Sequence, residues 1–195
     1  MKSAIKKFAL LFSLILITNS VSFAQTNYQS KVVDIKLNGT SNIHDWEMVA
    51  TTATSTATFV VNANGQVTAL SALSFVLPAV NLKSGHGQMD KNTYKALNAS
   101  KDPNISFTLT SATVTATGGN NYQINGVGKL SIAGTVKHTD LQATGKYNPA
   151  DKSFTVTGVK KMKMTDYNVA PPKALMGTIK TGDAISIAYT LKFTK

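Results

Sequence analysis

The sequence contains no cysteine and no arginine, and it has only one tryptophan and one glutamate. Without cysteine the chain forms no disulfide bond and carries no lipid-modified thiol, so an apolar core must stabilise any folded domain. Without arginine it lacks the planar side chain that pairs with phosphate through two parallel hydrogen bonds. These absences exclude a disulfide scaffold and argue against a nucleic-acid-binding protein.

Long apolar runs are also scarce, and the clearest one lies at the N-terminus. Three lysines precede the uncharged stretch FALLFSLILI, and Ser22-Phe23-Ala24 places small residues at the two key positions of a cleavage site. This pattern is typical of a secretory signal peptide, and the run is shorter than the roughly 20 apolar residues that span a bilayer. We therefore predict a signal peptide over residues 1–24, cleavage after Ala24, and a periplasmic or secreted protein.

Removing residues 1–24 leaves 171 of the 195 residues, a length that fits a single domain over residues 25–195. Three of the 20 basic residues lie in the signal peptide, which leaves 17 lysines against 9 acidic residues and a net charge of +8. Such a charge favours transient contact with phosphate-bearing surfaces such as lipid head groups. A well-solvated surface is the simpler interpretation.

Along most of the chain, apolar residues alternate with Thr, Ser or Lys. The alternation is clear in residues 33–37, 73–77, 105–109, 154–158 and 185–194, and segments rich in Asn and Gly or Pro separate such runs at residues 62–65, 118–121 and 148–151. Period-two patterns joined by turn residues indicate antiparallel strands with one face buried. We predict about eight to nine such strands.

One segment departs from this alternation. Met89, Thr93, Ala96 and Leu97 recur with helical spacing, and they precede Pro103, so we predict a short helix ending near Asn98. Many antiparallel strands without disulfides favour a closed barrel, because closure leaves no exposed sheet edge. The predicted fold is therefore all-β, a single antiparallel barrel of about eight strands with one helical insert, and a two-sheet sandwich is the alternative.

The stretch SNIHDWEM, residues 41–48, gathers residue types that are common in catalytic sites. If it forms a strand, His44 points to the opposite face from Asp45 and Glu47, so no catalytic dyad forms. If residues 42–45 form a turn, His44 and Asp45 can meet. We favour a structural or cavity-lining role for Trp46. A hydrolase that acts on a lipid or small ester with His44 in its site is the alternative.

The three histidines, His44, His86 and His138, match no local spacing of metal ligands. A metal site would need the fold to bring three separate segments together. We therefore predict no metal site and no cofactor.

Four stretches of the chain resemble a known family. They are GTSNIHDW at 39–46, LSFVLPAVNLKSGHGQMDKNTYKALNASKDPNISFTLTS at 73–111, GVGKLSIAGTVK at 126–137, and KMKMTDYNVAPPKALMGTIKTGDAISIAYTL at 161–191. Together they resemble the YceI-like family of exported lipid- and polyisoprenoid-binding proteins. The resemblance implies a lipocalin-like barrel whose apolar interior holds the tail of a polyisoprenoid or other amphiphilic lipid such as a fatty-acyl molecule. It brings no metal and no catalytic group.

Residue types and strand parity supply the candidate site residues. Methionine adapts to flexible apolar ligands, and with large aromatic residues it gives the predicted cavity lining: Trp46, Met48, Phe59, Phe75, Phe107, Met162, Met164, Met176 and Tyr189. The lysines that crowd the predicted rim, and that we expect to contact a head group weakly, are Lys160, Lys161, Lys163 and Lys173. A barrel filled by its own side chains would instead suit an extracytoplasmic scaffold or adhesion module.

Overall fold

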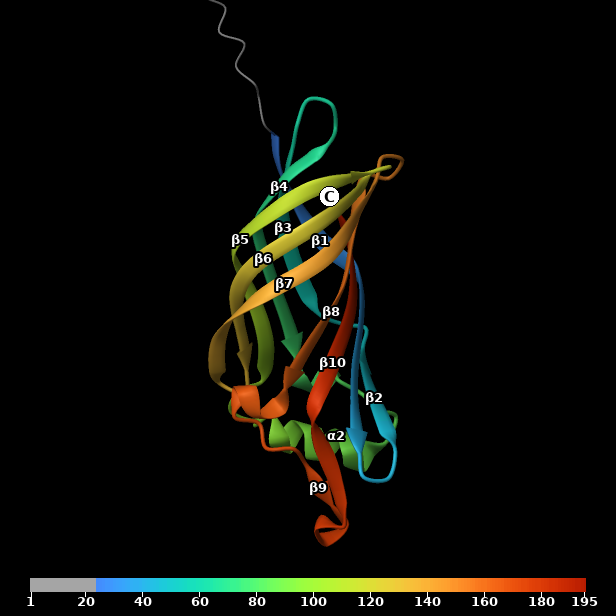
Figure 1. Cartoon of the computed structure of the whole chain (residues 1–195), viewed down its shortest axis with the longest axis vertical. Helices are drawn as coiled ribbons and strands as arrows, with labels where there is room; N and C mark the ends of the chain where they lie inside the picture. The colour runs from blue at the N-terminus through green and yellow to red at the C-terminus, as the bar shows by residue number, and fades with distance from the viewer. Residues whose placement is uncertain (1–23) are drawn as a thin grey trace, which may run out of the picture.

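The computed structural model describes residues 24–195. The predicted signal peptide lies outside the described residues except for Ala24, which begins the first strand. The elements, shown in Figure 1, are β1 (Ala24–Ser41), β2 (Asp45–Ala50), β3 (Thr54–Val61), β4 (Val67–Pro78), η1 (Ala79–Asn81), α2 (Gly87–Ala96), β5 (Asn104–Gly118), β6 (Asn121–Ile132), β7 (Thr135–Asn148), β8 (Ser153–Lys163), η2 (Met164–Tyr167), β9 (Lys173–Ala174), η3 (Leu175–Gly177) and β10 (Ile179–Thr194).

Eight antiparallel strands close into a ring in the order β1-β3-β4-β5-β6-β7-β8-β10, because β10 returns to pair with β1. Two further strands extend this ring at one end. β2 pairs with the C-terminal half of β1, beyond the half that pairs with β3, and β9 pairs with the start of β10. The closed ring confirms the predicted all-β barrel and is not a two-sheet sandwich.

Two ladders of the ring are incomplete. β4 pairs with β5 only through residues 74–78, and β7 pairs with β8 only through residues 143–148. Beyond that point, residues 135–142 of β7 pair with β6, whereas residues 159–163 of β8 pair with β10. We call the stretch where β7 and β8 part the β7/β8 seam.

The helix α2 crosses one end of the barrel (Figure 1). It ends in a left-handed turn, because Asn98 has a φ of 52° and the N–H groups of Asn98 and Ala99 bond the carbonyls of Lys95 and Tyr94. This pattern of bonds is a common helix C-terminus that satisfies the last free carbonyls. The single predicted helix is thereby confirmed, with its end two residues earlier than expected.

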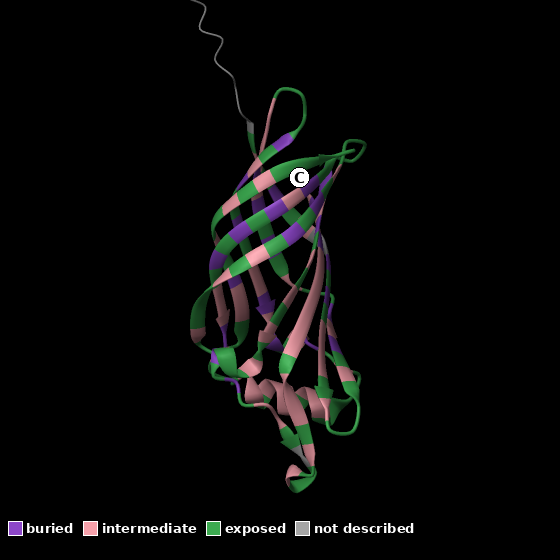
Figure 2. Cartoon of the chain, viewed as in Figure 1, coloured by how far each residue is buried: buried purple, intermediate pink, exposed green. Residues whose placement is uncertain are grey.

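The opposite end of the barrel is filled by aromatic side chains, which we call the aromatic plug. The Phe59 ring lies at its centre, with centroids 5.3 Å from Tyr28, 4.4 Å from Phe154 and 6.0 Å from Phe193. Tyr122 adds a contact of 5.6 Å to Phe154. All five side chains are buried, and Figure 2 shows buried residues concentrated in this half while intermediate ones surround α2. The two halves of the barrel are therefore packed differently.

Candidate functional site

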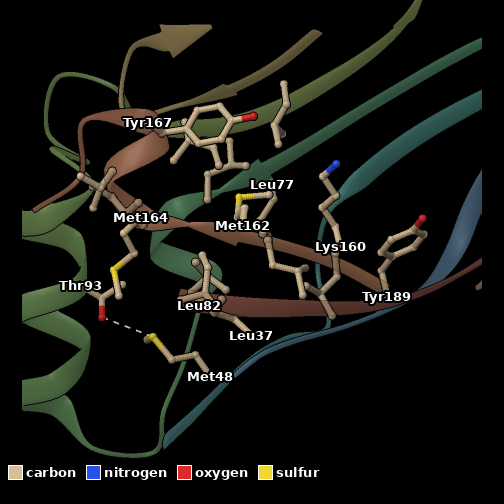
Figure 3. A pocket seen from close by; sticks show the side chains of 18 of the residues that line it. Leu37, Met48, Leu77, Leu82, Thr93, Lys160, Met162, Met164, Tyr167 and Tyr189 are labelled. Atoms are coloured by element: carbon tan, nitrogen blue, oxygen red, sulfur yellow. Dashed lines mark hydrogen bonds between the residues drawn. The ribbon is translucent and has the colours of Figure 1, made fainter. Parts of the chain in front are cut away.

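Between the aromatic plug and α2 the barrel contains a cavity of about 420 Å³. Several strands contribute to it side chains that alternate along the strand. On β10 these are the alternating residues Ile185, Ile187, Tyr189, Leu191 and Phe193, which the sequence pattern placed on one face. Apolar side chains therefore dominate the wall, and Figure 3 shows part of this lining, including Leu37, Leu77 and Leu82.

Eight of the nine side chains that the sequence suggested for a cavity lining border this one cavity. They come from six strands and η2, and they are Trp46, Met48, Phe59, Phe75, Phe107, Met162, Met164 and Tyr189. Met48 and Phe59 are buried, and the other strand residues of the set complete the wall around them. The period-two parity of the strands thus carries residues far apart in sequence to a common interior.

Met176 does not border the cavity, and its assignment to the lining is wrong. Its side chain is fully exposed, in the η3 turn that joins β9 to β10. Leu175, Met176 and Gly177 all have positive φ angles, so the chain reverses direction tightly beyond the end of the barrel. Strand parity does not extend into such a turn, and Met176 consequently points into solvent.

The four predicted rim lysines separate into three positions. Lys163 and Lys173 are exposed and border the open end of the cavity. Lys160 faces inward from β8 and forms part of the cavity wall, as its parity with Met162 implied. Lys161 faces outward onto a shallow groove that Glu47 also lines, so it is not a rim residue of the cavity.

Side chains close the β7/β8 seam where the backbone ladder stops. The Lys160 ammonium donates to the Asp140 carboxylate at 3.0 Å and to the Asp140 carbonyl at 3.1 Å. The Tyr189 hydroxyl donates to the Gln142 carbonyl at 3.2 Å, and its ring lies so close to Gly158 that a Cβ there would overlap the hydroxyl. Carbonyls that β8 would bond in a complete ladder are thus satisfied by side chains.

These contacts also fix the charge states along the seam. The hydrogen bond from Lys160 holds the pKa of the Asp140 carboxyl below its usual range, so this carboxylate is ionised at neutral pH. Burial raises the pKa of Tyr189 to about 12, which keeps its hydroxyl a neutral donor. The seam therefore places one ion pair and one hydroxyl in a mostly apolar wall.

The helix α2 is fixed over the cavity by hydrogen bonds along its length. The Asp90 carboxylate accepts from the Ser84 N–H at 2.8 Å and from its hydroxyl at 2.7 Å. The Thr93 hydroxyl donates to the sulfur of Met48 at 3.3 Å, as Figure 3 shows. The helix consequently lies across this end of the barrel, and it presents Met89 to the core together with Leu97, the residue after its last turn.

The cavity opens beside α2, and we call this opening the mouth. Its edge consists of the turn between β1 and β2 and the hairpin of β9 and β10, which contribute Ser41, Ile43 and His44 and Pro172, Lys173 and Ile179 respectively. The Asn42 side chain joins these two edges, because its amide donates to the Thr178 carbonyl at 2.9 Å and accepts from the Lys180 N–H at 2.8 Å. The two edges of the mouth therefore form one connected surface.

The SNIHDWEM segment forms the β1–β2 turn followed by β2. The His44 ring nitrogen Nδ1 lies 2.7 Å from the backbone carbonyl of Asp45 rather than from its carboxylate. The Ser41 hydroxyl accepts from the backbone N–H groups of Ile43 and His44 and donates to the His44 carbonyl at 2.7 Å. These are the bonds of a capped turn, so His44 and Asp45 do not form a side-chain dyad.

Trp46 has a packing role in this hairpin. Its indole N–H donates to the Thr40 carbonyl at 2.9 Å, and its ring lies directly over Gly39 on the paired strand. A Cβ at Gly39 would overlap the ring. The sole tryptophan is thus half-buried between the cavity and the outer groove.

The three histidines lie in separate elements, and within residues 24–195 no three His, Asp or Glu side chains gather in a metal-binding arrangement. Across the same range, no helix has the length and apolar character needed to cross a membrane.

Comparison with known proteins identifies the fold. A sequence model described as the YceI-like domain matches residues 18–193. The chain belongs to the YceI-like family. No match was found among curated proteins.

Three solved structures illustrate the likeness to the YceI-like fold. The Burkholderia cenocepacia protein BcnA is 18% identical, with a TM-score of 0.59, and the match covers 81% of this chain and 95% of that chain. A polyisoprenoid binding domain from Saccharophagus degradans implicated in plant cell wall breakdown is 10% identical, with a TM-score of 0.64 and coverage of 86% and 97%. The Campylobacter jejuni YCEI protein is 16% identical, with a TM-score of 0.53 and coverage of 72% and 81%. At these identities the likeness shows a shared fold.

The cavity of this YceI-like barrel is also lined by residues that the sequence pattern did not indicate. Tyr167 and Val169 border the cavity and form a small buried cluster with Ile132 next to the main core. Leu82 borders it from the segment before α2. Tyr167, Val169 and Leu82 lie outside the regular strands, so no periodic signal marked them. Leu37 and Leu77, in contrast, lie on strands whose alternation already pointed inward.

Proposed function

We propose that this YceI-like chain is an exported, non-catalytic binding protein that holds the apolar tail of an amphiphilic lipid in its cavity. The cavity of about 420 Å³ with its apolar wall carries the proposal. Its size falls in the usual range of ligand pockets, about 300–1,000 Å³. The likeness to a polyisoprenoid binding domain supports an isoprenoid or a similar lipid as the ligand class.

Burial of the tail is sufficient to supply useful affinity. Each methylene removed from water contributes about 0.8 kcal/mol, so a tail of about 15 carbons gains about 12 kcal/mol. Association costs at least about 4 kcal/mol, which leaves about 8 kcal/mol, the free energy of a micromolar complex. No charged contact is needed to reach this affinity, and the head group can remain at the mouth.

The polar groups of the mouth suit such a head group better than they suit catalysis. Lys163 and Lys173 are exposed there, where water and salt screen their attraction for a phosphate or carboxylate. His44, the candidate for a hydrolase, has its Nδ1 at the Asp45 carbonyl. We therefore assign selectivity chiefly to the apolar wall.

A pair of variants on one strand tests the cavity directly. Leu37→Asp places a carboxylate in the cavity wall. Asn38→Asp, at the next position of β1, places one on the outer face of the barrel. An unpaired charge against a buried tail costs several kcal/mol, so Leu37→Asp should weaken binding of a fluorescent fatty acid or a polyisoprenyl phosphate by at least about 100-fold. Asn38→Asp should leave it within about twofold.

Both variants must first show the wild-type far-UV circular dichroism spectrum. Equal affinity of a folded Leu37→Asp variant and the wild type would refute the cavity as the binding site. In parallel, native mass spectrometry of protein purified from its own host should reveal a co-purified apolar molecule. Export is tested on the same sample, because cleavage after Ala24 gives a chain that begins at Gln25.

A further inference from the structure

Three exposed apolar side chains project at the mouth, and we call them the tip. Ile43 in the β1–β2 turn is 56% exposed, and Leu175 and Met176 in the η3 turn are 71% and 109% exposed. A single exposed apolar residue is ordinary on a protein surface. Here, however, the Asn42 side chain ties the two turns together, so all three lie on one connected surface.

The backbone of the η3 turn makes its residue types notable. Leu175 and Met176 have φ angles of 48° and 56°, a region in which glycine, asparagine and aspartate are least costly. A turn that served only to reverse the chain in water would favour those small polar residues. In water, leucine and methionine at these positions therefore carry two costs. Their side chains disfavour a positive φ, and their apolar surface is exposed to solvent.

The hairpin that carries Leu175 and Met176 is basic, because residues 167–182 include Lys173 and Lys180 and no acid. Lys163, Lys173 and Lys180 are exposed on the same hairpin or beside it. The two nearest acids are engaged internally: Asp166 accepts from the Lys163 N–H, and Asp183 accepts from the Thr165 N–H and hydroxyl. Asp45 and Glu47, both in β2 next to the turn, are the other exposed acids nearby. On the hairpin, Lys173 and Lys180 therefore lie nearer in sequence to Leu175 and Met176 than any acid does.

We infer that the mouth docks on an anionic lipid bilayer. The tip inserts its apolar side chains at the level of the acyl chains, and the surrounding lysines contact the anionic head groups, the arrangement that peripheral membrane proteins use. The biological role of this docking, transfer of a lipid tail, rests on the proposed function. Because the cavity opens at this same surface, a docked barrel lets a lipid tail move between bilayer and cavity without crossing water.

Vesicle binding tests the docking with matched variants. Leu175→Gln/Met176→Gln removes the two most exposed side chains of the tip, and Val127→Gln/Val159→Gln removes two exposed apolar residues from the barrel wall, 44% and 57% exposed. Glutamine adds no charge, so both double variants keep the net charge. In co-sedimentation with vesicles of equal phosphatidylglycerol and phosphatidylcholine, the tip variant should bind at least about tenfold more weakly, and the wall variant within about twofold of wild type.

The lysines are tested in the same assay. Each lysine near an anionic surface contributes about fivefold, so Lys173→Gln/Lys180→Gln should reduce the partition coefficient by about 30-fold at low salt. Lys129→Gln/Lys146→Gln, on the barrel wall, is the matched control. Binding should fall steeply in about 0.5 M salt and on vesicles of pure phosphatidylcholine, because both remove the electrostatic attraction.

Three results would overturn the inference: no wild-type binding to anionic vesicles, equal losses in the tip and wall variants, or binding that ignores both salt and lipid charge. A concentration-dependent dimer that the tip variant lacks, without vesicle binding, would assign the tip to a second copy of the chain instead. Uptake of a fluorescent fatty acid in vesicle-free buffer is measured separately. Loss of uptake with intact vesicle binding would refute the proposed function and leave the docking in place.

Discussion

The aromatic plug should set the maximum length of a bound tail, and Phe59 is the residue that tests this. Its ring borders the closed end of the cavity and also touches three other aromatic rings. In Phe59→Ala the space of six ring carbons becomes continuous with the cavity. The bound tail can then extend toward Tyr28 and Phe154.

The cost to stability follows from burial. Phe59 is 1% exposed, and removal of a buried phenyl ring costs about 3–5 kcal/mol. With a urea dependence of about 2 kcal/mol per molar, the unfolding midpoint should fall by about 2 M. Phe59→Leu, which retains more of the packing, provides a second variant if the alanine variant folds poorly.

The longer cavity of Phe59→Ala should be detected by calorimetric titration with a series of fatty acids of increasing length. For the wild type, affinity should stop rising once the tail reaches the plug. For the variant it should continue to rise over several further methylenes, by up to about fourfold for each, since each buries about 0.8 kcal/mol.

Val67→Ala is the control, because Val67 is buried in the core but does not border the cavity. It should lower stability without changing the length at which affinity levels off. The same limiting length in folded Phe59→Ala and wild type would refute the role of the plug.

Two further predictions concern the scaffold. Gly39→Ala should displace the Trp46 ring, break its hydrogen bond to Thr40 and lower the free energy of unfolding by about 1–3 kcal/mol. The fluorescence of Trp46, the sole tryptophan, should shift with it. Gly87→Ala is the control: its Cβ meets open space, so it should change neither stability nor fluorescence. Bonds from Ser153 and Lys192 lower the pKa of Asp151 from 3.8 to about 2, so Asp151 stabilises the fold above pH 3.8 and this contribution is lost as the pH falls through 2. The melting temperature of Asp151→Asn should therefore be lower than that of wild type at pH 7, with the difference shrinking between pH 4 and pH 2; a constant difference would contradict the assignment.

The strands were predictable because their signal is local. In β10, five alternating apolar residues from Ile185 to Phe193 point inward, as parity requires of any strand with one buried face. The turns at residues 62–65, 118–121 and 148–151 likewise join consecutive strands, since their residue types set their own conformation. The same reasoning placed Trp46 and Met48 on one face.

The seam and the mouth were not predictable, because long-range pairing sets them. Nothing near Asp140 marks the point at which β7 leaves β8, and the bond from Lys160 joins residues 20 positions apart. Met176 failed for a related reason, since its place outside the barrel depends on a short β9–β10 hairpin in a segment with no periodic pattern. Which end of the barrel is closed could not be predicted either, because the closed end is formed by rings that five different strands bring together.

The β7/β8 seam gives the barrel a direction in which it can expand. Separating two fully paired strands would break a series of backbone hydrogen bonds, whereas widening the seam requires only that the contacts of Lys160 with Asp140 and of Tyr189 with Gln142 be remade. Along the barrel axis, in contrast, the five rings of the plug are buried and packed against one another. For the proposed lipid tail, width and length would therefore be limited by different parts of the molecule. A branched or methylated chain would strain the two side-chain contacts of the seam, whereas an overlong chain would meet the five packed rings of the plug.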